Sequence, residues 1–343
     1  MRIGVFDIGT RAARLLIGDT QDLAFRKNFG RLTRMGEYFD EDNNLKVEGF
    51  KKTLSVLREF LLEGKKYYIQ RYVAVGTAAL RKAKNRDQLL QLIKDILGLE
   101  ITILKREEEA YLSLLSAFCH FQHQIERERP ILLIDQGGGS TEISCGELKN
   151  NTFQFWGLGS LDLGSVVLKN HFLTNPKLQV GDSYRHTMAH IDKEIEQHSF
   201  FPELKHRPPV RAFGMGSAIT NITGVRGNRR QHGRVITAER MQYLINTRID
   251  LYEKSQITIE SLLESANEQE RLEELERDLL MLYGLPVYQS LLNTYQLDRL
   301  TVCGYGLRYG VFLYIALSGF AERNIPLNFT DHESLHLEAD VDL

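Results

Sequence analysis

The sequence predicts an α/β protein of two lobes, each built around its own sheet. Its 343 residues exceed one ordinary core and suit two domains. Over the first hundred residues, short apolar runs alternate with stretches whose apolar residues recur at helical spacing. An apolar run that ends in Asp and meets a glycine turn, VFDIGT, returns in varied form as LIDQGGGSTEI. This repetition predicts that the second lobe opens like the first.

The first lobe is predicted to begin with a β-hairpin. Residues 2–6 and 13–18 are apolar runs on either side of a polar turn that contains a glycine. Helices and strands then alternate along the chain. The expected elements are a helix over 46–63, a strand over 72–75, a helix over 86–97, a strand over 101–104 and a helix from about 107.

A change in composition predicts the boundary between the lobes. The polar run QHQIERER precedes a proline and a new apolar strand, ILLID. We therefore expect lobes at 1–127 and 128–326. Within the second lobe, the charged stretch 258–283 is expected to form a solvated amphipathic helix pair. Residues 327–343 are acidic and poor in apolar side chains, which is typical of a loose tail.

Composition and charge exclude several classes. The formal net charge of −2 gives no general attraction to nucleic acid or to a membrane, so neither is expected as a partner. The first apolar run meets Asp7 after six residues and is too short for a signal sequence or a membrane span, which predicts a cytoplasmic protein. Cys119, Cys145 and Cys303 lack metal-site spacing and are expected to be buried thiols.

Two glycine turns, each directly after an apolar strand, are the candidates for chemistry. Glycines let backbone N–H groups approach phosphate oxygens that a side chain would keep away. Asp7 and Asp135, at the strand ends, suit a hydrated Mg²⁺, which takes few carboxylates together with water and phosphate. Alternatively, each motif is only a hairpin turn, but the duplication favours phosphate binding. The candidate phosphate contacts are Gly9, Thr10, Gly137, Gly138, Gly139 and Ser140.

The motifs DIGT, VGTAALRKAKN, REEEA, IDQGGGSTEI, LDLGS, FGMGSAIT and CGYGLRYG, in this order and spacing, resemble the Ppx/GppA phosphatases over roughly residues 1–315. The resemblance implies the two-domain actin-like ATPase fold, of the ribonuclease H-like class that includes actin, Hsp70 and sugar kinases, with phosphates bound in an interdomain cleft. It implies Mg²⁺-dependent hydrolysis of terminal phosphate from polyphosphate or guanosine pentaphosphate. The partner is then an anionic, phosphate-rich small molecule or polyphosphate, and a homodimer is left open.

The resemblance places the catalytic base on Glu109. This carboxylate would take a proton from the attacking water, and bound phosphates and burial would raise its pKa toward that task. The alternative is that Glu107, Glu108 and Glu109 only complement the dipole at a helix start.

The resemblance also implies roles for other acidic, basic and glycine positions. Glu142 would face the metal and the water, and Asp7 and Asp135 would organise the metal. Arg81 would contact phosphate with its guanidinium, whereas the alternative is a solvated arginine in a basic helix start. Further glycine turns are expected to close around phosphate, each before a predicted helix: Gly164 with Ser165, and Gly216 with Ser217.

Several positions depart from the family pattern and leave the substrate open. Arg11, Lys105 and Arg106 add positive charge, and Gln136 stands where an aliphatic residue is usual. Arg11 is counted among the phosphate contacts. The rival functions are a nucleotide or alarmone phosphohydrolase of altered specificity and a non-hydrolysing alarmone or polyphosphate sensor. A basic run is expected to hold the far part of a polyanion or to be solvated: Arg226, Arg229, Arg230, His232 and Arg234.

Overall fold

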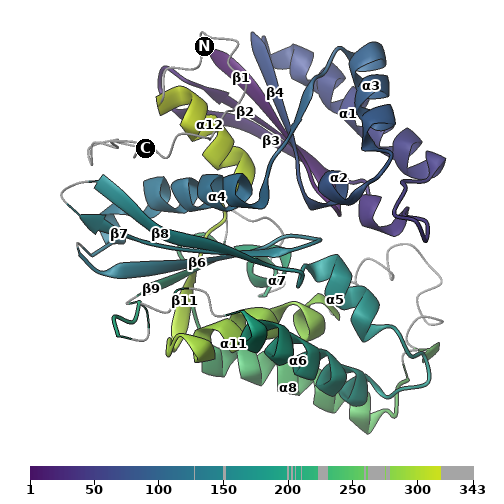
Figure 1. The fold of residues 1–343 in the computed structure, drawn as a ribbon, viewed down its shortest axis with the longest axis vertical. Helices are drawn as coiled ribbons and strands as arrows, with labels where there is room; N and C mark the ends of the chain where they lie inside the picture. The colour runs from purple at the N-terminus through teal and green to yellow at the C-terminus, as the bar shows by residue number, and fades with distance from the viewer. Residues whose placement is uncertain are drawn as a thin grey trace. The chain divides into compact units, whose positions relative to one another are not determined.

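The chain forms two compact units, which we describe separately. Unit 1 contains Met1–Ile125, Leu148–Gln154 and the described residues from Tyr305 onward; unit 2 contains Glu126–Glu147 and Phe155–Gly304. Figure 1 shows the elements of both units as a ribbon. The structure, a computed structural model, describes residues 1–126, 128–149, 152–198, 201, 204, 206–209, 211–222, 231–258, 260–261, 275 and 279–317.

A mixed sheet in the order β3-β2-β1-β4-β5 forms the centre of unit 1. Strand β2 runs antiparallel to both β1 and β3, whereas β4 and β5 run parallel to β1. Strand β1 is buried along nearly its whole length, as a central strand covered on both faces must be. The strands are β1 Arg2–Ile8, β2 Ala12–Asp19, β3 Ala24–Leu32, β4 Arg71–Gly76 and β5 Ile101–Ile103.

Helices cover both faces of this sheet. Phe60 of α1 and Ile93 of α3 share one apolar core with Ile17 of β2. The next residue along β2, Gly18, faces the other way, and a Cβ there would lie 2.4 Å from the ring of Phe312 on α12. The helices of unit 1 are α1 Val47–Gly64, α2 Ala78–Lys82, α3 Arg86–Leu97, α4 Arg106–Phe121 and α12 Leu307–Leu317, with short 3₁₀ turns at Met35–Glu37, Lys65–Tyr67 and Gln122–Gln124.

A second mixed sheet, in the order β10-β11-β9-β6-β7-β8, forms the centre of unit 2. Strand β6 pairs antiparallel with β7 and parallel with β9, and β9 pairs parallel with β11. The order β8-β7-β6-β9-β11 therefore repeats the order β3-β2-β1-β4-β5 of unit 1. The strands are β6 Pro130–Gln136, β7 Thr141–Lys149, β8 Thr152–Leu161, β9 Arg211–Gly216, β10 Val235–Thr237 and β11 Arg299–Val302.

The helices of unit 2 pack around a large apolar core. Leu132 and Ile134 of β6 share this core with Ile191 of α6, Met241 of α8 and Leu291 of α11. Helices α6, α8 and α11 also pack against one another. The helices of unit 2 that the structure describes along their whole length are α5 Ser165–Phe172, α6 Val180–Gln197, α7 Ser217–Thr220, α8 Ala238–Lys254 and α11 Leu285–Thr294.

The predicted α/β class and the predicted elements of the first lobe are confirmed. The predicted lobes, 1–127 and 128–326, were continuous, and the compact units differ from them, because the chain returns to unit 1 at Tyr305. The three cysteines are buried thiols, as expected. Most of the stretch 258–283, the tail 327–343 and the basic residues Arg226, Arg229 and Arg230 lie outside the described residues.

No helix in the described part of the chain has both the length and the apolar composition that a membrane crossing requires.

The return of the chain to unit 1 is fixed by contacts between α12, the segment before it and α4. The hydroxyl of Ser116 donates to the carbonyl of Tyr305 at 2.8 Å, and the ring of His120 stacks on the ring of Tyr305 with centroids 3.7 Å apart. Gly310 lies so close to α4 that a Cβ there would meet the carbonyl oxygen of Leu112 at 1.8 Å. The two helices are therefore in backbone contact.

Replacing Gly310 by Ala should destabilise the protein by about 2 kcal/mol, because the added methyl group forces α12 away from the α4 backbone. Urea unfolding measures the loss. Gly306→Ala is the matched control, since a Cβ at Gly306 meets nothing within 4 Å, and its cost should stay below about 1 kcal/mol. Equal losses for the two variants would contradict the close crossing.

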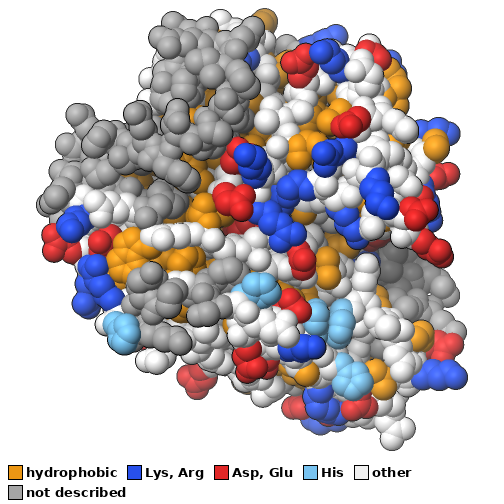
Figure 2. Space-filling view, viewed as in Figure 1, with side chains coloured by type: hydrophobic (Ala, Val, Ile, Leu, Met, Phe, Trp, Pro, Cys, Tyr) orange, Lys and Arg blue, Asp and Glu red, His pale blue; other side chains and the backbone are white. Residues whose placement is uncertain are grey.

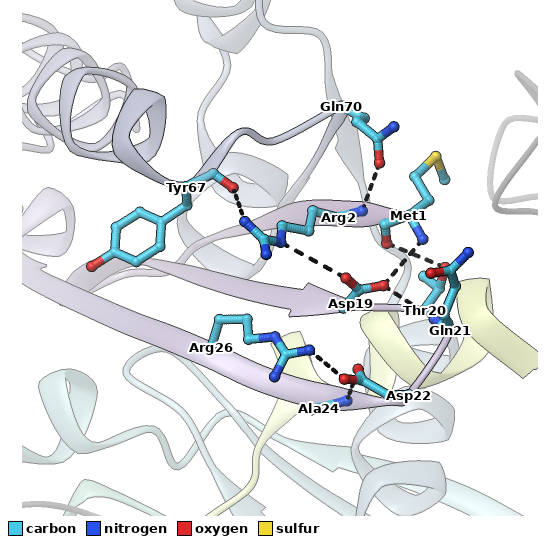
Figure 3. Close-up of polar contacts among 10 residues, drawn as sticks. All are labelled: Met1, Arg2, Asp19, Thr20, Gln21, Asp22, Ala24, Arg26, Tyr67 and Gln70. Atoms are coloured by element: carbon cyan, nitrogen blue, oxygen red, sulfur yellow. Dashed lines mark hydrogen bonds and ion pairs between the residues drawn. The ribbon is translucent and has the colours of Figure 1, made fainter.

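Polar contacts tie the start of β1 to the end of β2 (Figure 3). The amino group of Met1 donates to Asp19 Oδ1 at 3.1 Å, and Arg2 Nε lies 3.7 Å from Asp19 Oδ2. The guanidinium of Arg2 also donates to the carbonyl of Tyr67 at 3.0 Å. Burial raises the pKa of Asp19, but the Gln21 N–H and the Met1 ammonium bring it below the ordinary value of 3.8.

This lowered pKa predicts a pH-dependent contribution to stability. Because folded Asp19 binds a proton less readily than unfolded Asp19, its contribution is complete above the ordinary pKa of 3.8 and is lost as the pH falls through the lower folded value. Asp19→Asn should therefore be less stable than the wild type at neutral pH, with a gap that narrows as the pH falls below 3.8 and through the lower folded pKa. Thermal unfolding across this range measures the gap, and a gap that does not change with pH contradicts the assignment.

Candidate active site

In each sheet, a loop that begins with glycine joins two antiparallel strands, β1 to β2 in unit 1 and β6 to β7 in unit 2. We call these the first loop (Gly9–Ala12) and the second loop (Gly137–Ser140). In the first, the N–H of Gly9 donates to the carbonyl of Ala12 at 3.0 Å. In the second, the N–H of Gly137 donates to the carbonyl of Ser140 at 2.9 Å. The repetition seen in the sequence is thus a repetition of backbone structure.

The strand register extends this equivalence to the charged residues beside the loops. Asp7 lies opposite Arg14 across β1 and β2, and Asp135 lies opposite Glu142 across β6 and β7. The second loop is therefore flanked by two carboxylates, whereas the first is flanked by a carboxylate and a guanidinium. Arg14 Nη1 lies 4.0 Å from Asp7 Oδ2. Sequence reasoning missed Arg14, although aligning the two repeats by register would have found it.

Glu109 and Arg81 form a close ion pair within unit 1. Arg81 lies in the last turn of α2, just after β4, and Glu109 lies in the first turn of α4, just after β5. Arg81 Nη1 donates to Glu109 Oε2 at 2.6 Å and to the carbonyl of Leu104 at 2.8 Å. Both side chains are largely buried, with exposed fractions of 18% and 11%. A positive charge thus stands beside the carboxylate and favours its ionised form.

The charged residues next to Arg81 and Glu109 in sequence fit the simpler alternatives, in which acids complement a helix start and basic residues are solvated. Glu107 is exposed, and Glu108 Oε2 accepts the N–H of Lys105 at 2.7 Å as an N-terminal cap. Lys82 and Lys84 are exposed, and Lys and Arg side chains gather on the face where Figure 1 labels α2 (Figure 2). Glu109 and Arg81 differ because they turn inward and meet each other.

The carboxylate of Glu142 is buried beside the second loop. Its Oε1 accepts the hydroxyl of Ser140 at 2.6 Å and the hydroxyl of Ser160 at 3.2 Å. The residue is only 2% exposed. Two hydroxyl donors stabilise the charged form and fix its orientation, so Glu142 is held as an oriented carboxylate at the loop.

The turn at Gly164 packs directly on the second loop. A Cβ at Gly164 would lie 2.3 Å from the carbonyl carbon of Gly139, so only glycine fits. The N–H of Ser165 donates to the carbonyl of Gly137 at 2.9 Å, and the N–H of Val166 donates to the carbonyl of Gly138 at 2.8 Å. These two donors of α5 thus hold the loop, whereas the sequence predicts that the turn at Gly164 and Ser165 closes around phosphate.

Gly216 makes a similarly close approach at the end of β9. Its φ of +106° is in the region that favours glycine, and a Cβ there would lie 2.2 Å from the carbonyl oxygen of Gln136. Ser217 begins α7, which has only four residues. The side chain of Gln136 is 2% exposed and bonds to backbone carbonyls of unit 2, so it contributes to the interior of the unit.

The predicted site residues divide between the units. Asp7, Gly9, Thr10, Arg11, Arg81 and Glu109 belong to unit 1, and Asp135, Gly137, Gly138, Gly139, Ser140, Glu142, Gly164, Ser165, Gly216 and Ser217 belong to unit 2. Within unit 1 the structure brings together Arg81 and Glu109. Within unit 2 it brings together the second loop, Glu142 and Gly164.

Sequence reasoning also missed Arg308 of α12, which is 4% exposed. Its Nε donates to Asn28 Oδ1 at 3.1 Å, and its guanidinium lies 4.7 Å from the centre of the Tyr309 ring. Burial and the charge of Arg14 lower the pKa of Arg308, whereas Tyr309 and Asp7 raise it. In the sequence, CGYGLRYG serves only as a family motif and does not single out this buried cation, whose pKa the charge of Asp7 influences.

The carboxylates beside the second loop are candidate ligands for a divalent cation. Among the described residues, no group of three or more His, Cys, Asp or Glu side chains is arranged to hold a metal ion. Asp135 and Glu142 form a cross-strand carboxylate pair beside a loop rich in glycine N–H groups. Such a pair fits Mg²⁺, which takes few protein carboxylates and fills its shell with water and phosphate oxygens.

Two mixed sheets of the same strand order, each ending in a glycine loop after an aspartate, define an α/β protein of the actin-like ATPase class. The sequence model of the Ppx/GppA phosphatase family matches residues 23–318, and the chain belongs to this family. The predicted family and fold class are thereby confirmed.

Individual relatives agree with this membership. The chain is 26% identical over 313 residues to a guanosine-5'-triphosphate,3'-diphosphate pyrophosphatase of Vibrio parahaemolyticus, covering 89% of this chain and 57% of that protein. It is 29% identical over 181 residues to a bifunctional 3-dehydroquinate synthase/phosphatase of Fusobacterium nucleatum, covering 50% of this chain and 26% of that protein. The chain thus spans only part of the length of these curated relatives.

A solved structure of the Aquifex aeolicus PPX-GPPA enzyme superposes with a TM-score of 0.70 at 25% identity, covering 91% of this chain and 99% of that chain.

Proposed function

We propose that the protein is a hydrolase that releases terminal phosphate from a phosphoanhydride, either inorganic polyphosphate or guanosine pentaphosphate. The observation that carries this proposal is the buried Glu109–Arg81 pair, with 2.6 Å between Oε2 and Nη1, in a chain of the Ppx/GppA phosphatase family. A carboxylate held ionised and oriented is suited to accept a proton from water.

Glu109 is proposed to orient the attacking water and to take its proton. Arg81 holds Glu109 in place through Nη1. Its Nη2 is buried and has no hydrogen-bond partner among the described residues. A buried donor without an acceptor is costly, and a phosphate oxygen would satisfy it. Arg81 is thus proposed to connect the base to the substrate.

The two glycine loops are proposed to bind phosphate oxygens through their N–H groups, with the hydroxyls of Thr10 and Ser140 and the guanidinium of Arg11 beside them. Asp7, Asp135 and Glu142 would hold the Mg²⁺. When bound, that ion would neutralise charge on the phosphate oxygens. Gly164 and Gly216 support the second loop by close backbone packing, and the turn at Gly216–Ser217 is proposed to bind phosphate as well.

Two substrates are proposed, inorganic polyphosphate and guanosine pentaphosphate. The Vibrio relative is a guanosine-5'-triphosphate,3'-diphosphate pyrophosphatase, which supports an alarmone substrate for this chain as well. Arg14 beside Asp7 adds to the positive charge of Arg11 near the first loop and favours a highly charged substrate of either kind. A non-hydrolysing sensor is the rival, and the buried base argues against it. The cytoplasmic location and the homodimer stay predictions.

The test is phosphate release by the purified full chain from polyphosphate, guanosine pentaphosphate, GTP and ATP, with Mg²⁺ and with EDTA. We expect release from at least one of the first two substrates with Mg²⁺ and none with EDTA. Release that EDTA leaves unchanged would overturn the metal assignment. Tight binding of a substrate without release from any of them would establish the sensor instead.

A further inference from the structure

Helix α11 is attached to the ends of two strands by a pair of buried side chains, Gln136 and Tyr288, which we call the α11 anchor. Gln136 is the last residue of β6, and its Nε2 donates to the carbonyl of Gly284, which precedes α11, at 3.2 Å. Tyr288 lies in the first turn of α11, and its hydroxyl donates to the carbonyl of Met215 on β9. One hydrogen bond thus runs from a strand side chain to the carbonyl before the helix, and the other runs from a helix side chain to a strand carbonyl.

The α11 anchor lies where the proposed phosphate-binding turns begin. Gly137 follows Gln136 directly, and Gly216 follows Met215 directly. The space between them is filled, because a Cβ at Gly216 would lie 2.2 Å from the carbonyl oxygen of Gln136 and 2.9 Å from the hydroxyl of Tyr288. A shift of α11 would therefore move both turns.

We propose that Gln136 and Tyr288 are positioning residues, which hold the turns at Gly137–Ser140 and Gly216–Ser217 in the geometry that binds phosphate. Gln136 is 2% exposed and Tyr288 is fully buried, so neither side chain touches substrate. They act through the backbone of the turns. Their effect on turnover rests on the proposed function, whereas their effect on the order of the turns does not.

The chemistry of Tyr288 suits a permanent donor. Burial raises its pKa well above the ordinary value of 10.0, and the charge of Asp135 raises it further. The hydroxyl therefore keeps its proton and donates to Met215 at any pH at which the protein works. Tyr288 also lies within the electrostatic reach of Asp135, whose carboxylate is a proposed metal ligand.

A substitution at Gln136 can separate the effect on the order of the turns from the effect on the stability of the whole protein. Its Oε1 is buried and has no hydrogen-bond partner among the described residues, which costs stability. An aliphatic residue of the same size, usual at this place in the family that the sequence resembles, would avoid that cost and lose the bond to Gly284. Gln136→Leu should thus unfold at the same temperature as the wild type or higher, while its turns become less ordered.

Amide hydrogen exchange of the full chain tests the positioning role directly. Tyr288→Phe and Gln136→Leu should each speed exchange in peptides that cover 137–140 and 214–217 by about tenfold, because local opening becomes easier. Tyr295→Phe is the matched control, since it makes the same change at the other end of α11 and should leave these peptides unchanged. Thermal unfolding of each variant separates local loosening from global destabilisation.

Turnover is the second readout. If the chain releases phosphate, Tyr288→Phe and Gln136→Leu should lower kcat/KM by about tenfold or more, because a displaced turn misplaces the substrate. Tyr295→Phe should keep wild-type kcat/KM. Unchanged exchange in both turns of both anchor variants would overturn the positioning role, whatever the turnover. Absence of phosphate release in the wild type would overturn the proposed function and leave the exchange result to decide the α11 anchor.

Discussion

Glu109→Gln should lower kcat for phosphate release by a factor of about 10² to 10⁴, the usual loss when a general base is removed. Glutamine keeps the size of the side chain and its oxygen can still accept from Arg81, so the fold should survive. It cannot take a proton from water. Measurement of kcat and KM for the substrate identified in the release assay shows the loss, which should fall on kcat.

Glu107→Gln is the matched control for this prediction. It makes the same chemical change two residues earlier on α4, at an exposed position. Its kcat should equal that of the wild type. If both variants retain full activity, Glu109 is not the base, and the ion pair with Arg81 is structural.

Arg81→Met should destabilise the protein by about 3 kcal/mol, because it leaves the carboxylate of Glu109 largely buried without its cation. It should also abolish measurable phosphate release, since Arg81 is proposed to hold both the base and the substrate. Chemical unfolding and the release assay measure the two effects separately.

The double variant Arg81→Met/Glu109→Gln isolates the cause of that instability. Without a carboxylate there is no buried charge to leave unpaired, so the double variant should be more stable than Arg81→Met alone. It should remain inactive. A double variant no more stable than Arg81→Met would show that the carboxylate left without its cation is not the cause of the instability.

The sequence predicts much of this molecule because the signals are local. The strand-and-glycine-loop motif, read twice, gave the α/β class and the starts of both sheets, and the register shows that the repeat continues beyond the loops to Arg14 and Glu142. The strand and helix order of the first lobe also followed from periodicity.

The parts that the sequence did not predict depend on contacts between distant residues. The N–H groups of Ser165 and Val166 look like an anion site in sequence, yet they bond to carbonyls of the second loop 28 residues earlier. Gln136 looks like an altered loop residue, yet its partner Gly284 lies 148 positions away. The charge partner of Glu109 was named, but the pairing itself was not, because 28 residues separate it from Arg81.

The return of the chain to unit 1 at Tyr305 has a consequence for how the protein is made. Unit 2 is encoded almost without interruption, so its sheet is complete once β11 has left the ribosome. The long first segment of unit 1 must wait until then, with the faces of α4 and β1 that later receive α12 still open to water. Unit 1 is thus begun first during synthesis but completed last, when α12 is made. Nascent chains stalled before residue 307 should bind chaperones through the surface that α12 later covers.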